Sequence, residues 1–167
     1  MMLRGLFQDI FGSGSDGFEA GKSLPSIELC DQAGELVALD AMMAEGLTYV
    51  FFYPRAETPV CTAQACGVRD ELADFKTRGL RVVGVSADSP HRLAGFAQRH
   101  GFDYPLLSDP EGKAMEVFGV KRVFGQFASR RSFLVRDGVI LWKADSSIPS
   151  RQLAELDAVL RSLEQES

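Results

Sequence analysis

The amino-acid sequence predicts an α/β domain with a mixed central β-sheet and helices on both of its faces. Two apolar runs, residues 47–53 and 80–86, are typical of buried parallel strands, and a helical pattern lies between them. The dipeptide Asp137-Gly138 indicates a tight hairpin late in the chain, which adds antiparallel pairing. Parallel and antiparallel strands are therefore expected within one sheet.

A β-hairpin is the first predicted element. Residues 26–29 and 35–39 flank the turn-forming segment 31–34, whose sequence is DQAG. The run 47–53 (LTYVFFY) follows; it is rich in β-forming residues and ends at Pro54, as expected of a buried central strand.

A helix is expected over residues 59–78, where apolar residues recur at helical spacing and Gly79 supplies the stop. The second buried strand, residues 80–86 (LRVVGVS), comes next. Ser89 is the natural N-cap of a further helix that begins with Pro90 and runs to about residue 100.

The last third of the chain predicts a short strand at 104–107 and a helix that opens at Ser108-Asp109-Pro110 and runs to about residue 118. The Asp137-Gly138 turn joins strands at 132–136 and 139–143. A final amphipathic helix covers about residues 149–163, and its apolar stripe consists of Leu153, Leu156, Leu160 and Leu163.

After the N-terminal hairpin, the predicted order is thus β-α-β-α-β-α-ββ-α, which fits a thioredoxin-like fold. A flavodoxin-like, doubly wound fold is the competing architecture. The late hairpin counts against it, because that fold would alternate strand and helix to its end.

The composition excludes several function classes. It is ordinary for a soluble globular protein, with 46% hydrophobic and 25% charged residues. The net charge of −5 and the scattered Lys and Arg residues argue against a nucleic-acid partner. No apolar run approaches the ~20 residues that cross a bilayer, so no membrane partner is expected.

Residues 1–20 are expected to form a flexible N-terminal extension, and residues 21–167 the folded domain. The segment 12–17 (GSGSDG) is typical of a linker, and the N-terminus lacks the apolar core and cleavage pattern of a secretory signal. The alternative for the extension is a short amphipathic docking helix built on Leu3, Leu6, Phe7, Ile10 and Phe11.

The chain has three cysteines and is expected to be cytoplasmic, where thiols stay reduced. Each cysteine is therefore judged singly. Cys30, beside Leu29 in the first hairpin, is expected to be structural.

Cys61 has the surroundings that a reactive thiol needs. It lies in the first turn of the predicted helix, where free backbone N–H groups and the positive end of the helix dipole favour a thiolate. Thr58 offers a hydroxyl that can orient a peroxide along the line of attack, and Pro54 and Pro59 stiffen the loop. An added arginine would stabilise the thiolate further.

Cys66 supplies a second thiol. A cysteine sulfenic acid condenses readily with a nearby thiol to give a disulfide. On an intact helix, however, residues 61 and 66 are about 140° apart in rotation and about 7.5 Å apart in rise, which a disulfide does not span. We therefore expect the first turns of the 59–78 helix to unwind on oxidation.

The segment YPRAETPVCTAQACGVRD resembles the peroxiredoxins, whose signature of Pro, three residues, Thr, two residues and Cys is met by Pro54, Thr58 and Cys61. A second cysteine five residues on, here Cys66, is similar to the peroxiredoxin Q subfamily, also called bacterioferritin comigratory protein. Later segments, among them VVGVSADSP and RRSFLVRDG, are similar to the same subfamily.

The resemblance implies a thioredoxin-like fold and reduction of hydrogen peroxide and organic hydroperoxides by Cys61. It further implies an intramolecular disulfide with Cys66 and recycling by thioredoxin or a similar dithiol carrier. The family's active-site arginine corresponds to Arg130, three residues before Phe133. Arg131 is the alternative, because strand alternation points the two side chains to opposite faces and does not choose between them.

The two cysteines also allow other functions. A general thiol–disulfide oxidoreductase is disfavoured because four residues, not two, separate the cysteines. A redox sensor would use the same unwinding and stays open as an alternative function.

Glu57 and Arg69 could support the site or be solvated, and His91 and His100 are expected to be solvated. No metal or organic cofactor is expected, and an intramolecular resolving cysteine favours a monomer.

Overall fold

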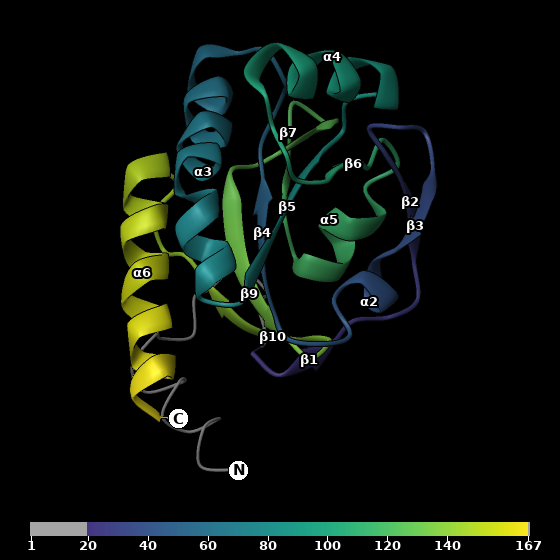
Figure 1. The fold of residues 1–167 in the computed structure, drawn as a ribbon. Helices are drawn as coiled ribbons and strands as arrows, with labels where there is room; N and C mark the ends of the chain where they lie inside the picture. Colours follow the sequence, from purple (N-terminus) through teal and green to yellow (C-terminus); the bar gives the residue numbers. More distant parts are fainter. Residues whose placement is uncertain (1–19, 167) are drawn as a thin grey trace.

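The computed structural model describes residues 20–166, which form an eight-stranded mixed sheet with helices on both faces (Figure 1). Strand β4 (Leu47–Phe52) is central; it pairs in parallel with β5 (Leu80–Ser86) and antiparallel with β9 (Arg131–Arg136). The strand order is β1-β10-β9-β4-β5-β6-β2-β3. The expected mixed sheet is confirmed.

The other strands of this sheet are β1 (Lys22–Ser23), β2 (Glu28–Asp31), β3 (Leu36–Ala38), β6 (Leu106–Ser108) and β10 (Val139–Lys143). Two short strands, β7 (Arg122–Val123) and β8 (Phe127–Ala128), form a separate hairpin. The helices are α2 (Leu39–Met42), α3 (Pro59–Thr77), α4 (Pro90–His100), α5 (Lys113–Phe118) and α6 (Pro149–Glu166).

Alternating side chains of β4 supply the core on each face of the sheet. Tyr49 and Phe51 belong to a cluster that includes the buried sides of α3, α4 and α6. Val50 and Phe52 belong to a second cluster, against α2 and α5. Figure 1 shows α3 and α6 covering one face and α2 and α5 the other. The run 47–53 is therefore apolar at nearly every position because both of its faces are covered.

Most of the predicted elements are confirmed, and several boundaries are wrong. The first hairpin strand, expected at 26–29, is Glu28–Asp31, and the last helix extends to Glu166 rather than to residue 163. Helix α5 begins at Lys113, not at Pro110, because residues 109–112 form a turn in which the Gly112 amide donates to the Asp109 carbonyl. Gly112 has a φ of 74°, which a helix does not accommodate. The short strand expected at 104–107 is Leu106–Ser108.

The sequence patterns did not indicate β1, α2 or the β7–β8 hairpin, each too short for a periodic signal. The proposed N-terminal extension lies outside the described residues, apart from Ala20. Within residues 20–166, no helix is both long enough and apolar enough to cross a membrane.

Candidate active site

Cys61 lies just after the loop that joins the central strand β4 to helix α3. The loop from residue 53 to residue 57 leads to Thr58, whose extended backbone ends the loop, and α3 begins at Pro59. Cys61 is the third residue of α3 and is buried, with 1% of its surface exposed. The amide of Thr62 donates to the Thr58 carbonyl at 2.8 Å and closes the first turn. Cys61 therefore occupies the helix start that the sequence predicts.

Arg130 is the arginine that faces this thiol. Its Nη2 donates to Cys61 Sγ at 3.3 Å, and its Nη1 donates to Oε1 of Gln64, one helical turn further along α3. Arg131 is the first residue of β9 and donates instead to the carbonyl of Arg130 at 3.0 Å. The structure thus brings Arg130, rather than Arg131, to Cys61.

Thr58 and Pro54 belong to the same loop, and both are partly exposed. The Thr58 hydroxyl donates to the carbonyl of Arg55 at 2.7 Å, so its proton is engaged within the loop. A hydroxyl oxygen that donates its proton can still accept a hydrogen bond. This geometry leaves Thr58 able to accept from a protonated oxygen of a bound molecule.

An ion pair from the α4 side holds the backbone of this loop. The Ala56 amide donates to Oδ2 of Asp88 at 2.8 Å, and the Ala56 carbonyl accepts from Arg92 at 3.0 Å. Asp88 and Arg92 are themselves paired at 3.1 Å. Both polar groups of one residue are therefore fixed by side chains of opposite charge, which restricts the loop that carries Thr58.

Glu57 and Arg69 connect the loop and α3 to the end of α4. Glu57 adopts a φ of 67°, and its carboxylate pairs with Arg99 at 3.1 Å and with His100 at 3.6 Å. Arg69 donates to the His100 carbonyl at 2.7 Å. The expectation that His100 is solvated is wrong, because its side chain is largely covered and stacks on Phe102. His91, by contrast, is exposed.

Two tyrosines line the apolar side of the site. Tyr53 belongs to the same buried cluster as Cys61, and the Tyr104 hydroxyl donates to the carbonyl of Ala65 in α3 at 2.8 Å. Burial raises the pKa of both tyrosines far above the ordinary value of 10.0. Both phenols therefore stay neutral at physiological pH and place no negative charge beside the thiol.

Cys66 lies on the same uninterrupted helix as Cys61 and is partly buried. Cys30 lies on β2, where it pairs with Leu36 of β3 and Ser108 of β6, and it is not part of the site. All three thiols are free. Among residues 20–166, no group of His, Cys, Asp and Glu side chains is arranged to hold a metal ion.

Three residues that contact the site were not among the sequence candidates. Gln64 carried a weak signal, because it is polar and lies three residues after Cys61 on the same helix face. Asp88 follows the carboxyl end of β5, the edge at which ligands collect in such sheets. For Arg92, no local pattern distinguished it from other charged residues of an amphipathic helix.

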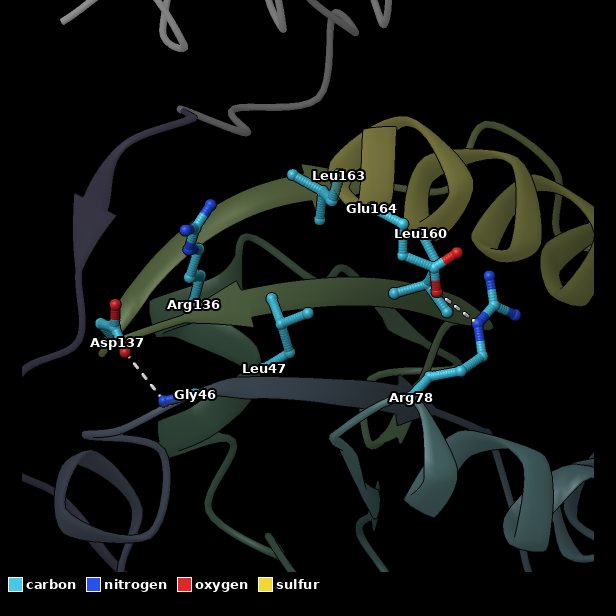
Figure 2. A pocket seen from close by; sticks show the side chains of 8 residues that line it. All are labelled: Gly46, Leu47, Arg78, Arg136, Asp137, Leu160, Leu163 and Glu164. Carbon is cyan, nitrogen blue, oxygen red and sulfur yellow. Dashed lines mark hydrogen bonds and ion pairs between the residues drawn. The ribbon is translucent and has the colours of Figure 1, made fainter. Parts of the chain in front are cut away.

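A groove of about 390 Å³ lies at the opposite end of β4 (Figure 2). It includes Gly46 and Leu47, at the start of the strand, and Arg78, which pairs with Glu164 of α6 at 2.7 Å. The remaining lining residues are Arg136, Asp137, Leu160 and Leu163. None of the candidate site residues lines it, so this groove is separate from the thiol site.

A comparison with known proteins decides the family. The family model described as AhpC/TSA matches residues 20–143. The chain belongs to this family and is a peroxiredoxin. A Mycobacterium tuberculosis relative described as a peroxiredoxin is 41% identical over 128 residues, which cover 72% of this chain and 81% of that relative. Peroxiredoxin Bcp of Escherichia coli is 42% identical over 102 residues, 61% of this chain and 65% of Bcp.

Solved structures give the same assignment. Peroxidoxin BcpB from Mycobacterium tuberculosis matches this peroxiredoxin with a TM-score of 0.79 and 35% identity, covering 87% of this chain and 97% of that chain. The bacterioferritin comigratory protein of Xanthomonas campestris matches with a TM-score of 0.71 and 26% identity, over 89% and 99% of the two chains. The thioredoxin-like fold is confirmed, and the chain is a thiol peroxidase of the Bcp/peroxiredoxin Q type.

Proposed function

We propose that Cys61 is the peroxidatic cysteine, that it reduces hydrogen peroxide and organic hydroperoxides, and that Cys66 resolves it within the same chain. The observation that carries this assignment is the contact between Arg130 Nη2 and Cys61 Sγ at 3.3 Å, in the first turn of α3. A guanidinium and the free amides of a helix start both stabilise a thiolate. Neither Cys66 nor Cys30 combines a place in the first turn of a helix with a hydrogen bond from a guanidinium.

The first step breaks the O–O bond of the peroxide. The Cys61 thiolate attacks one peroxide oxygen, an S–O bond forms, and the second oxygen takes a proton and leaves as water or an alcohol. Arg130 can donate to the peroxide while it stabilises the thiolate, and Thr58 can accept from the protonated oxygen. Pro54 shapes the loop that shields the sulfur. Cys61 is left as a sulfenic acid.

The second step requires movement of α3. The Cys66 thiolate attacks the sulfenic sulfur, an S–S bond forms, and the departing hydroxide is protonated to water. Because both cysteines lie on one helix, about 7.5 Å apart in rise and about 140° apart in rotation, the bond forms only after the first turns of α3 unwind. Thioredoxin or a similar dithiol carrier then reduces the disulfide.

This route needs no second subunit and no metal or organic cofactor, so we propose a monomeric enzyme. A recycled disulfide also needs a supply of reduced dithiol, which places the enzyme in a reducing compartment such as the cytoplasm. Light scattering at working concentration checks the first statement, since a stable dimer would contradict it.

The test is rapid-mixing peroxide reduction, with and without thioredoxin, by the wild type and by three variants in each of which one cysteine is replaced by serine. Cys61→Ser should abolish the reaction. Cys66→Ser should complete one turnover and stop as the sulfenic acid, and Cys30→Ser, the matched control, should behave as the wild type. A Cys61→Ser protein that consumed peroxide at the wild-type rate would refute the assignment.

Unwinding has a separate measurement. Amide exchange of residues 60–66 should become faster when the reduced protein is treated with one equivalent of peroxide, and helical circular dichroism should decrease. Unchanged exchange and dichroism, in protein whose Cys61–Cys66 disulfide is verified by mass spectrometry, would contradict the movement.

A further inference from the structure

A row of buried polar side chains leads from Arg130 to the C-terminal helix α6. Arg130 donates to Oε1 of Gln64, and Gln64 Nε2 donates to Oε1 of Gln152 at 3.1 Å. Gln64 is 3% exposed and Gln152 is fully buried. Gln152 is one of the buried residues of α6, together with Leu156, Val159 and Leu160, and an unsatisfied amide at such a position would be costly. A glutamine at this position is therefore a feature that packing alone does not explain.

A backbone carbonyl sets the direction of the whole row. Nε2 of Gln152 donates to the carbonyl of Ser146 at 2.9 Å, and a carbonyl can only accept. Oε1 of Gln152 must then face the interior, where it accepts from Gln64. Gln64 consequently turns its NH2 group toward Gln152 and its oxygen toward Arg130. The acceptor oxygen of Gln152 and the donor-only guanidinium of Arg130 therefore favour the same orientation of Gln64, which Gln152 fixes from the α6 side.

The Oε1 atom of Gln152 accepts a hydrogen bond from a second donor as well. The Ser132 hydroxyl donates to Oε1 of Gln152 at 2.7 Å and accepts from the Tyr49 hydroxyl at 2.8 Å. Ser132 is fully buried and Tyr49 is 1% exposed. This branch satisfies the second lone pair of Gln152 but leads away from Cys61, so it can be cut without breaking the row from Gln152 to Arg130.

We propose that Gln152 is a positioning residue for the peroxide step, which it serves by orienting Gln64 so that Arg130 is held against Cys61. The proposal rests on the roles proposed above for Cys61 and Arg130. Gln152 acts through Gln64 and Arg130, not by contact with substrate. It makes α6, about ninety residues from Cys61 in sequence, a part of the support of the active site.

Gln152→Met tests the proposal, because methionine keeps the length of the side chain and removes both polar groups. Without this acceptor, the buried Nε2 group of Gln64 loses its partner, so Gln64 is less firmly held in the orientation in which its oxygen accepts from Arg130. We expect oxidation of Cys61 by hydrogen peroxide to become roughly five- to tenfold slower. The rate is measured by competition against a reference peroxidase.

A second readout separates positioning from stability. In a Cys30→Ser/Cys66→Ser background, Cys61 is the sole thiol of the chain, and its alkylation by iodoacetamide can be followed against pH. Gln152→Met should move the midpoint of this profile to higher pH by roughly half a unit to one unit, because a tenfold loss of thiolate stabilisation corresponds to one pH unit.

Two controls accompany the variant. Gln165→Met makes the same chemical change on the exposed part of α6 and should alter neither readout. Ser132→Ala removes a buried hydrogen bond to the same Gln152 oxygen, so it should lower stability while leaving the oxidation rate within about twofold of the wild type. Arg130→Met/Gln152→Met should be no slower than Arg130→Met alone, because residues that act in series are not additive.

Three outcomes would overturn the proposal. The first is a Gln152→Met protein whose oxidation rate and alkylation profile equal those of the wild type, and the second is a Ser132→Ala protein whose oxidation rate falls as much as that of Gln152→Met. The third is an Arg130→Met/Gln152→Met protein that is slower than Arg130→Met by the same factor by which Gln152→Met is slower than the wild type. Failure of the proposed function is distinguishable, because in that case the wild-type Cys61 would itself not be oxidised by peroxide.

Discussion

Replacement of Arg130 by methionine is the perturbation that most directly measures the electrostatics of the site. The variant removes a guanidinium whose Nη2 lies 3.3 Å from Cys61 Sγ. At this distance and an effective dielectric constant of about 20, a full charge on each partner would attract by about 5 kcal/mol. Arg130 is only partly buried, so solvent screening reduces this figure.

Measured hydrogen bonds to charged groups contribute about 1.5–3 kcal/mol, which is the better guide for a partly exposed pair. We therefore expect Arg130→Met to slow oxidation of Cys61 by about ten- to a hundredfold. Competition kinetics with hydrogen peroxide measure the rate, and the alkylation profile in the sole-thiol background should move to higher pH by about one to two units.

Arg131→Met is the matched control, because it removes the same charge from the next residue. Arg131 donates to the Arg130 carbonyl, so a modest loss of up to about threefold is expected. If Arg130→Met retained a third or more of the wild-type rate, or if Arg131→Met lost as much, the electrostatic reasoning would be refuted.

Further predictions concern the helix, the buried tyrosines and one buried carboxylate. Gly67→Ala should stabilise α3 by up to about 1 kcal/mol, and its new Cβ would make an ordinary 3.4 Å contact with Leu153. Because α3 must unwind, the variant should form the Cys61–Cys66 disulfide up to about fivefold more slowly. Quench-and-alkylate time courses measure this rate, and an unchanged rate would count against unwinding. Burial raises the pKa of all three tyrosines above 10.0, so the unfolded chain loses protons first and stability should fall as pH rises above about 10. Phenolate absorbance at 295 nm should therefore appear together with unfolding, and its appearance in folded protein at pH 10.5 would contradict this. Burial also raises the pKa of Asp109 above 3.8, so the folded state takes up its proton first and this carboxyl's contribution to stability should increase as pH falls toward 4. Asp109→Asn should remove that contribution, and a parallel urea-stability profile for wild type and variant between pH 7 and pH 4 would contradict it.

Much of the fold was predictable because the signals are local. The alternation and turn residues of β9 and β10 lie within a dozen positions, and the strand at 80–86 is observed with the predicted bounds. The N-cap at Ser89 is confirmed by its hydrogen bond from the Arg92 amide. The start of α5 was misjudged because a turn and a helix start use the same residue types, and the choice depends on the backbone angle of Gly112.

The sequence by itself determined where the proposed peroxidatic thiol lies. Cys61 at the start of a helix, Thr58 three residues before it and Cys66 five residues after it are all related by short spacings, and backbone geometry converts such spacings directly into positions.

Only the tertiary structure decided which side chains complete the site. Arg130 contacts Cys61 across 69 positions of sequence, and Gln152 contacts Gln64 across 88. Arg130 also lies one residue before β9 begins, so strand alternation does not govern its direction. The physical reason is range: local patterns act over one or two helical turns, whereas these contacts depend on how α3, β9 and α6 pack together.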